Sequence, residues 1–169
     1  NCYQIASNHN ESFAHFILGN YYSNDELDEI DIQKSIEYYL KSIQIPNGHY
    51  IEIDSDISIQ KFSKNNHRYV SCNNLGLIFI TYSKYFDKNK ARKYLKESAY
   101  EEYPLGQYNY GLFNQIYLND SQTDTTEYMY EKILKNNNFS LAYYNLGKIN
   151  ENNNDNDKSI QFYIEASKY

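Results

Sequence analysis

Apolar residues recur along this chain at the three- and four-residue spacings of an amphipathic helix, in short segments separated by polar turns. Residues 10–22 carry Phe13, Ile17 and Tyr22 in that register, and residues 31–43 show the same spacing. Asp155 to Asp157 precede the last such segment, where they would cap a helix. The pattern predicts an all-α protein built from consecutive helix pairs.

A Leu-Gly or Tyr-Gly step returns in the first helix of each predicted pair. The glycines are Gly19, Gly76, Gly111 and Gly147, and the last two intervals are 35 and 36 residues. A small residue follows each glycine 12 to 16 positions later, and these residues are Ser35, Ala91, Thr126 and Ser159. Periods of this length are typical of stacked helix pairs, so we predict a helical-repeat array.

A glycine in mid-helix costs about 1 kcal/mol relative to alanine, so its return at four equivalent positions requires compensation. We expect that the backbone of a neighbouring helix approaches each glycine closely, and that the four small residues serve the facing helix in the same way. Leucine at any of the four glycines should therefore be severely destabilising through overpacking.

One interval breaks the period, because 57 residues separate Gly19 from Gly76. The surplus lies in an insertion that follows a Pro-Asn-Gly turn signal. It could form an extended hairpin or a short helix over residues 57–64, and we favour the helix. The predicted boundaries are 1–8 for the end of a preceding repeat helix, 9–44 for repeat 1, 45–66 for the insertion, 67–100 for repeat 2, 101–136 for repeat 3 and 137–169 for repeat 4.

Both ends of the predicted array resemble interior repeats. The chain opens with what reads as the end of a helix, and no segment after the last helix covers its apolar face. Solenoids need polar caps at both ends. We therefore expect either a window from a longer array or two exposed, adhesive ends, and flanking domains of a longer chain are among the expected partners.

Charge and composition exclude some classes of partner. The formal net charge is −6, from 16 Lys and Arg against 22 Asp and Glu, so we expect no nucleic acid to bind. The apolar stretches are too short to cross a bilayer, so we expect no membrane insertion. Tyrosine is abundant, with 21 residues, and must supply much of the packing.

Three segments resemble Sel-one-like repeats, which are relatives of the tetratricopeptide repeat. They are KSIEYYLKS, KARKYLKESA and KSIQFYIEAS, and helices containing NLG or NYG accompany them. The resemblance covers nearly the whole chain except residues 45–66, and repeat 3 departs most, with Asn114 where Tyr22 and Phe79 stand in other repeats. It implies a right-handed α-solenoid, a TPR-like superhelix, whose first helices line a concave groove. It also implies an adaptor or scaffold of the cytoplasm or the endoplasmic-reticulum lumen.

Seven residues of the predicted first helices are candidates for that groove. An amide ladder of Asn74, Asn109 and Asn145, each two positions before the repeat glycine, could pair with the backbone of an extended peptide. The residues three positions before the glycine, which are Phe16, Asn73, Tyr108 and Tyr144, should face the same groove. The alternative is structural, with the asparagines bonded to a neighbouring turn and the tyrosines packed between helices.

Catalytic patterns are scarce. Cys2 and Cys72 stand alone without a Cys-x-x-Cys spacing, and a Cys72/His67 nucleophile pair has nothing to orient the histidine. We therefore expect no enzyme, metal or cofactor. The leading hypothesis is a scaffold for a protein or peptide partner, and the alternative is a structural spacer without a ligand of its own.

Overall fold

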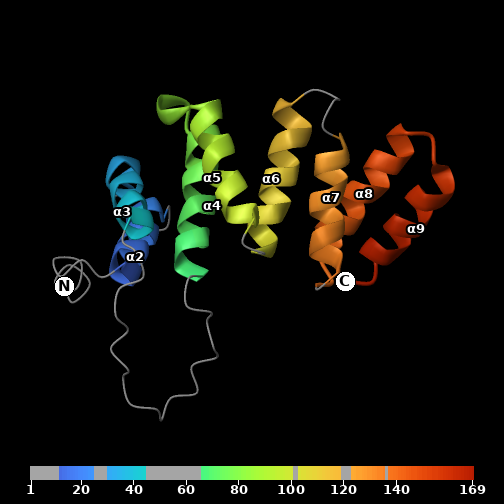
Figure 1. Ribbon diagram of the computed structural model, residues 1–169, viewed down its shortest axis with the longest axis horizontal. Coiled ribbons are helices and arrows are strands. Elements are labelled where there is room, and N and C mark those ends of the chain that lie inside the picture. Colours follow the sequence, from blue (N-terminus) through green and yellow to red (C-terminus); the bar gives the residue numbers. More distant parts are fainter. Residues whose placement is uncertain (1–11, 25–29, 45–65, 101–102, 119–122, 136) are drawn as a thin grey trace, which may run out of the picture. The chain divides into compact units, whose positions relative to one another are not determined.

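The computed structural model describes residues 12–24, 30–44, 66–100, 103–118, 123–135 and 137–169. These residues form eight α-helices and one short 3-10 turn, η1 (Ser83–Tyr85) (Figure 1). The helices are α2 (Ser12–Ser23), α3 (Ile32–Gln44), α4 (Asn66–Thr81), α5 (Lys88–Tyr100), α6 (Pro104–Tyr117), α7 (Thr123–Leu134), α8 (Ser140–Asn152) and α9 (Asn156–Ala166). The predicted all-α class is therefore confirmed.

The helices pack as sequential antiparallel pairs, and each pair joins a first helix to a second helix. The pairs are α2–α3, α4–α5, α6–α7 and α8–α9. The described residues divide into two compact units, one before and one after the boundary at residues 94 and 95 within α5. Each unit is described by itself below.

The predicted helices over 10–22 and 31–43 correspond to α2 and α3, and the bounds differ by one or two residues. Pro104 opens α6, where its fixed φ suits the first turn and its missing N–H has no partner to lose. The expected helix end within residues 1–8 and the expected helix over 57–64 lie outside the described residues.

A tyrosine ring of the second helix covers the glycine of the first helix in three of the pairs. A Cβ placed on Gly19 would lie 2.5 Å from Cδ1 of Tyr39, and one on Gly147 would lie 2.6 Å from Cε1 of Tyr163. In the pair α6–α7, a Cβ on Gly111 would lie 2.8 Å from Cε1 of Tyr130. Gly19, Gly111 and Gly147 are therefore required by a facing ring, and not by a neighbouring helix backbone as we expected.

The small residue of the second helix permits a further contact in the first pair. Ser35 is buried and its hydroxyl donates to the carbonyl of Gly19 at 2.9 Å. That carbonyl belongs to the same glycine that Tyr39 covers, so Ser35 and Tyr39, one turn apart on α3, both contact α2 at Gly19. Ser35 therefore bonds the facing helix directly.

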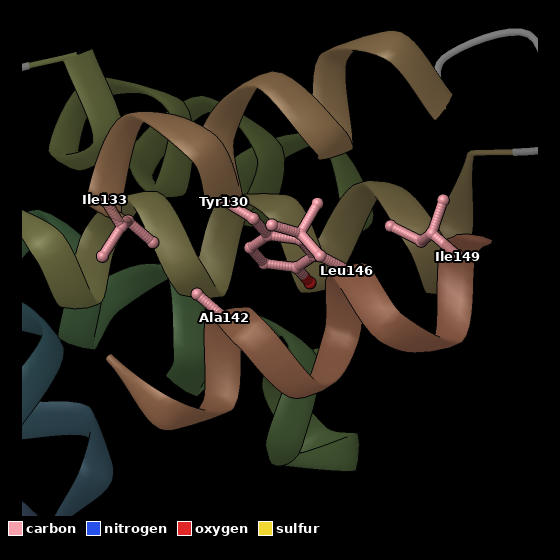
Figure 2. Close-up of a cluster of buried hydrophobic side chains, with 5 residues drawn as sticks. All are labelled: Tyr130, Ile133, Ala142, Leu146 and Ile149. Atoms are coloured by element: carbon pink, nitrogen blue, oxygen red, sulfur yellow. The ribbon is translucent and has the colours of Figure 1, made fainter. Parts of the chain in front are cut away.

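The apolar core of the second unit lies between α7 and α8. Figure 2 shows side chains of the two helices facing one another. The buried members are Tyr130, Ile133, Ala142, Leu146 and Ile149. Tyr130 thus serves twice, because its ring also covers Gly111 within its own pair. One aromatic residue connects the packing within a pair to the packing between pairs.

Aspartates cap three of the four second helices. Asp31, Asp87 and Asp155 each accept a hydrogen bond from the backbone N–H three residues on, at 3.0, 3.0 and 3.3 Å. The residue three positions on is a lysine in every case, and its ammonium also pairs with the carboxylate. The hydrogen bonds from these lysines lower the pKa of each aspartate. The expected cap at Asp155 is confirmed.

Replacing Gly111 by Ala tests the ring-on-glycine packing. In an ordinary helix this change would stabilise by about 1 kcal/mol, but here the methyl would press on the ring of Tyr130. We expect a net destabilisation of about 1–3 kcal/mol, measured by urea unfolding. The same change in a Tyr130→Leu background should cost clearly less, and an equal cost in both backgrounds would contradict the contact.

Acid should destabilise the fold through the three caps. Their folded-state pKa values are lowered from the usual 3.8, so the stability that they contribute is complete above the unfolded value and is lost in the acid range below it, as pH falls through the folded values. The check is the urea midpoint as a function of pH, for the native chain and for a triple variant with Asn at Asp31, Asp87 and Asp155. Asparagine caps without titrating, so the triple variant should show a weaker pH dependence in this window.

Candidate interaction surface

The first helices carry almost no charge, whereas the second helices are richly charged. α2 and α6 contain no charged residue, α4 contains Arg68 and α8 contains Lys148 and Glu151. Interface cores are depleted of charged side chains in the same way. Within each unit, the outward side of the first helices is therefore the candidate interaction surface.

One apolar position of the first helices recurs on this surface, six residues before the repeat glycine. Phe13, Leu105 and Leu141 occupy it, and they are 55%, 40% and 50% exposed. In the second pair the position holds Val70, which is half-buried. Leu105 and Leu141 lie three residues before Tyr108 and Tyr144, so each pair shares one helix face.

In the first unit, aromatic rings gather around His67 at the start of α4. The rings of Phe13 and Phe16 on α2 lie 6.0 and 6.4 Å from its imidazole. The hydroxyl of Ser12 donates to the carbonyl of Ser42 at 2.7 Å, so at its 2.8 Å contact with Nε2 of His67 it acts as the acceptor. Burial lowers the pKa of His67. The cluster is thus an apolar contact that joins α2 to α4.

The hydroxyl of Tyr39 connects two helix pairs. It donates to Oδ1 of Asn20 in its own pair at 2.6 Å, and it accepts from Nδ2 of Asn74 in the next pair at 3.0 Å. Burial raises the pKa of Tyr39, so the phenol keeps the proton that it donates. Asn74 therefore fixes the position of α4 against α3.

The same contact recurs between α7 and α8. Nδ2 of the buried Asn145 donates to the hydroxyl of Tyr130 at 3.3 Å, and burial raises the pKa of that phenol. In α5, the second helix that precedes Asn109, the position of Tyr39 and Tyr130 is occupied by Leu95, which has no hydroxyl. Two of the three ladder amides are therefore bonded to a tyrosine of the preceding second helix, and not to a neighbouring turn.

The structure separates the seven predicted groove residues by exposure. Asn73 is 1% exposed and its amide donates to Asn74, so it is inaccessible to a partner in this conformation. Asn145 is also buried, whereas Tyr144 is about half exposed. The half-buried members are Phe16, Asn74, Tyr108 and Asn109. The exposed leucines and Phe13 were not among our candidates, although their fixed distance from the repeat glycine is visible in the sequence.

Asn114 on α6 is the described residue whose amide is buried without a hydrogen-bond partner on either atom. At the equivalent position Tyr22 stacks on Tyr38, and Phe79 stacks on Tyr94, with ring centroids 5.6 and 5.9 Å apart. An unsatisfied buried amide costs stability, so repeat 3 departs from the others here in structure as well as in sequence.

A cavity of about 360 Å³ lies where the start of α3 meets η1. Its charged lining groups already have partners within the chain. Asp31 caps α3, and the ammonium of Lys84 lies 5.2 Å from the centre of the Tyr85 ring. We assign no ligand to this cavity.

The described residues contain no group of three or more His, Cys, Asp or Glu side chains placed to hold a metal ion. Cys72 was considered as a nucleophile with His67 as its base. Cys72 is fully buried and His67 bonds Ser12, so the two side chains do not meet at a surface cleft. Among the same residues, no helix has the length and apolar character needed to cross a bilayer.

Comparison with known proteins identifies the fold. The chain matches the crystal structure of MamA with a TM-score of 0.65 and 17% sequence identity, over 98% of this chain and 83% of that chain. MamA is a tetratricopeptide-repeat (TPR) protein, so the arrangement of sequential helix pairs is TPR-like. No protein-family model and no curated protein sequence matches the chain.

Removing the hydroxyl of Tyr130 tests the contact between pairs. The Tyr130→Phe variant keeps the ring over Gly111 but leaves the buried amide of Asn145 without this partner. We expect a loss of about 1 kcal/mol in the free energy of unfolding. The exposed Tyr144 provides the matched control, because Tyr144→Phe should change stability by less than about 0.5 kcal/mol. Equal effects of the two changes would argue against the bond.

Proposed function

We propose that this chain is a non-catalytic interaction scaffold that binds a protein or an extended peptide along the outward side of its first helices. We also propose that its repeats belong to the Sel-one-like group within the TPR-like fold. TPR-like folds commonly mediate protein interactions, which supports the general role. The fold does not select a partner, so the proposal depends on the surface itself.

The observation that carries the proposal is the scarcity of charge on the first helices, with none on α2 and α6, together with their repeated exposed apolar position. A solvent-facing helix side normally carries charged residues, yet α6 has none over fourteen residues. Leu105 and Ile116 on that helix are exposed. A partner that buries these side chains would remove apolar area from water without desolvating charges.

The amide ladder contributes less to partner binding in this proposal than we expected from the sequence. The side chains of Asn74 and Asn145 donate to tyrosine hydroxyls, so recognition by apolar contacts is favoured over pairing of these amides with a peptide backbone. Asn109 is half-buried and stays a proposed partner contact. Phe16, Tyr108 and Tyr144 remain proposed aromatic anchors.

The structural use of Asn74 and Asn145 also favours the second candidate, a spacer that sets the distance between neighbouring domains. Both candidates share the fold, and they differ in whether the first helices bind anything. Because packing within and between the helix pairs would by itself account for the tyrosine and glycine positions, only the exposed leucines distinguish the two candidates. The experiment below therefore changes the leucines and leaves the packing untouched.

Selection of peptides from a displayed random library tests the proposal. We expect the native chain to enrich peptides with apolar side chains and a Leu105→Lys, Leu141→Lys double variant to bind them at least tenfold more weakly, a loss of about 1.4 kcal/mol or more. The affinity of each enriched peptide would be measured by fluorescence anisotropy, after circular dichroism has shown equal helicity.

The matched control is Tyr128→Lys, which places the same charge at an exposed aromatic position on the second helix α7. This variant should bind as the native chain does. Peptides that bind all three proteins equally would show that the first helices are not the binding surface. No enrichment by the native chain would favour the spacer.

A further inference from the structure

His15 is a titratable side chain buried between α2 and α3. It is 3% exposed, and its imidazole stacks on the ring of Tyr38 with ring centroids 6.0 Å apart and an interplanar angle of 30°. It lies four residues before Gly19, so the two positions share the side of α2 that packs against α3. A change in the charge of His15 therefore acts on the contact that joins the two helices of this pair.

The surroundings of His15 favour its neutral form. The ammonium of Lys41 lies 5.1 Å from the centre of the Tyr38 ring, so a proton on His15 would place two cations beside one ring. Desolvation by burial lowers the pKa of His15, and the positive charge of Lys41 lowers it further. Protonation therefore costs more in the packed helix pair than in an opened one.

α2 itself carries no charged residue, so the other groups that bear on His15 belong to the helices packed against α2. They are Asp31, Lys34, Glu37 and Lys41 at or on α3, and His67 and Arg68 on α4. Asp31 pairs with Lys34 at 2.9 Å, and Glu37 accepts from the side chain of Gln33 at 3.2 Å. Lys41 is the charged group among them that shifts the pKa of His15, and it opposes protonation.

The direction of the pH dependence follows from this lowered pKa. Above the usual histidine value of 6.5 the imidazole is neutral in the packed and the opened state alike. Below that value the opened state binds a proton first, so the stability that His15 packing contributes falls as pH falls. The aspartate caps remain ionised until pH falls below the usual 3.8 of an aspartate. Mild acid therefore acts on histidine and leaves the caps in place.

Histidine is confined to the first half of the sequence. The four histidines are His9, His15, His49 and His67, and all of them precede the second unit, which begins at Leu95. The side chains of the second unit therefore lack the group that titrates between neutral pH and mild acid. That unit provides an internal reference for any effect of mild acid on the first.

We propose that His15 is a pH switch between α2 and α3, whose protonation in mild acid loosens the packing of α2 while the second unit keeps its structure. α2 carries Phe13 and Phe16, which belong to the proposed interaction surface. Loosening α2 therefore weakens the binding of a partner that contacts these rings. This consequence for binding rests on the function proposed above, whereas the switch itself does not.

Hydrogen exchange at about pH 7.5 and about pH 5.5 tests the switch, with each rate divided by the intrinsic rate of an unfolded amide at the same pH. We expect the protection of α2 to fall about threefold or more at the lower pH, and that of α8 in the second unit to be unchanged. A His15→Phe variant keeps an aromatic ring beside Tyr38 but cannot bind a proton. Its α2 should be equally protected at both pH values.

The matched control replaces the other three histidines, as His9→Gln, His49→Gln and His67→Gln, and leaves His15 as the only histidine. We expect this variant to respond to acid as the native chain does. Unchanged protection of α2 in the native chain, a full response in His15→Phe or an equal loss in α8 would overturn the proposal.

A second measurement applies if His15→Phe does not fold. The single imidazole of the control variant is titrated by NMR, and we expect a pKa below the usual 6.5. A pKa at or above that value would overturn the proposal, because protonation would then no longer oppose the packing of α2.

The effect on binding is measured separately, with selected peptides that lack histidine and whose affinity Phe13→Lys reduces. We expect the native chain to bind them about threefold or more weakly at the lower pH, and His15→Phe to bind them equally at both. Equal binding by the native chain would overturn the consequence for binding. If no such peptide is found, the proposed function fails at α2, and hydrogen exchange still decides the switch because it needs no ligand.

Discussion

The contact on which this fold depends is a tyrosine ring packed against a helix at a glycine. The ring of Tyr39 occupies the volume that a Cβ on Gly19 would take, and the same is true of the last two pairs. The short distance lets the two helices of a pair approach closely. The ring-on-glycine contact also fixes the position of the tyrosine hydroxyl. For Tyr39 and Tyr130, that hydroxyl lies within hydrogen-bonding distance of the first helix of the next pair. One side chain therefore sets both the geometry within a pair and the register between pairs.

Charged residues of the second helices also stabilise two of the helix pairs, α2–α3 and α4–α5. The ammonium groups of Lys34 and Lys90 bond the capping aspartates, and they also lie 5.1 and 5.3 Å from the ring centres of Tyr22 and Phe79 on the first helices. A cation over an aromatic ring contributes on the order of 0.5–1 kcal/mol at an exposed site. The first helices need no charges of their own for these contacts, and α2 carries none.

The repeating positions could be predicted from the sequence because helix pairs need the same close approach in each repeat. The periodic glycines predicted the helix pairs. The cap at Asp155 could also be predicted, because aspartate is a favoured residue at a helix N-terminus. The group that fills the space beside Gly19 could not be predicted, because a glycine indicates that space is short and not which atoms occupy it. Asn73 and Asn74 show a second limit. Adjacent helix residues point about 100° apart, so a small error in helix rotation exchanges a buried position for a half-buried one.

The exposed leucines were overlooked for a related reason. Leu105 and Leu141 continue the apolar spacing of their helices, and periodicity alone assigns such residues to the core. Only their exposure identifies them as surface. The asparagines present the converse case, because polar residues at regular spacing suggested a surface, yet Asn145 is buried against Tyr130. Bonded amides have little capacity left to pair with a peptide backbone, so a partner on this face would be selected mainly by the shape and apolar area of its side chains. Such recognition should depend weakly on salt, in contrast to recognition by clusters of charged residues.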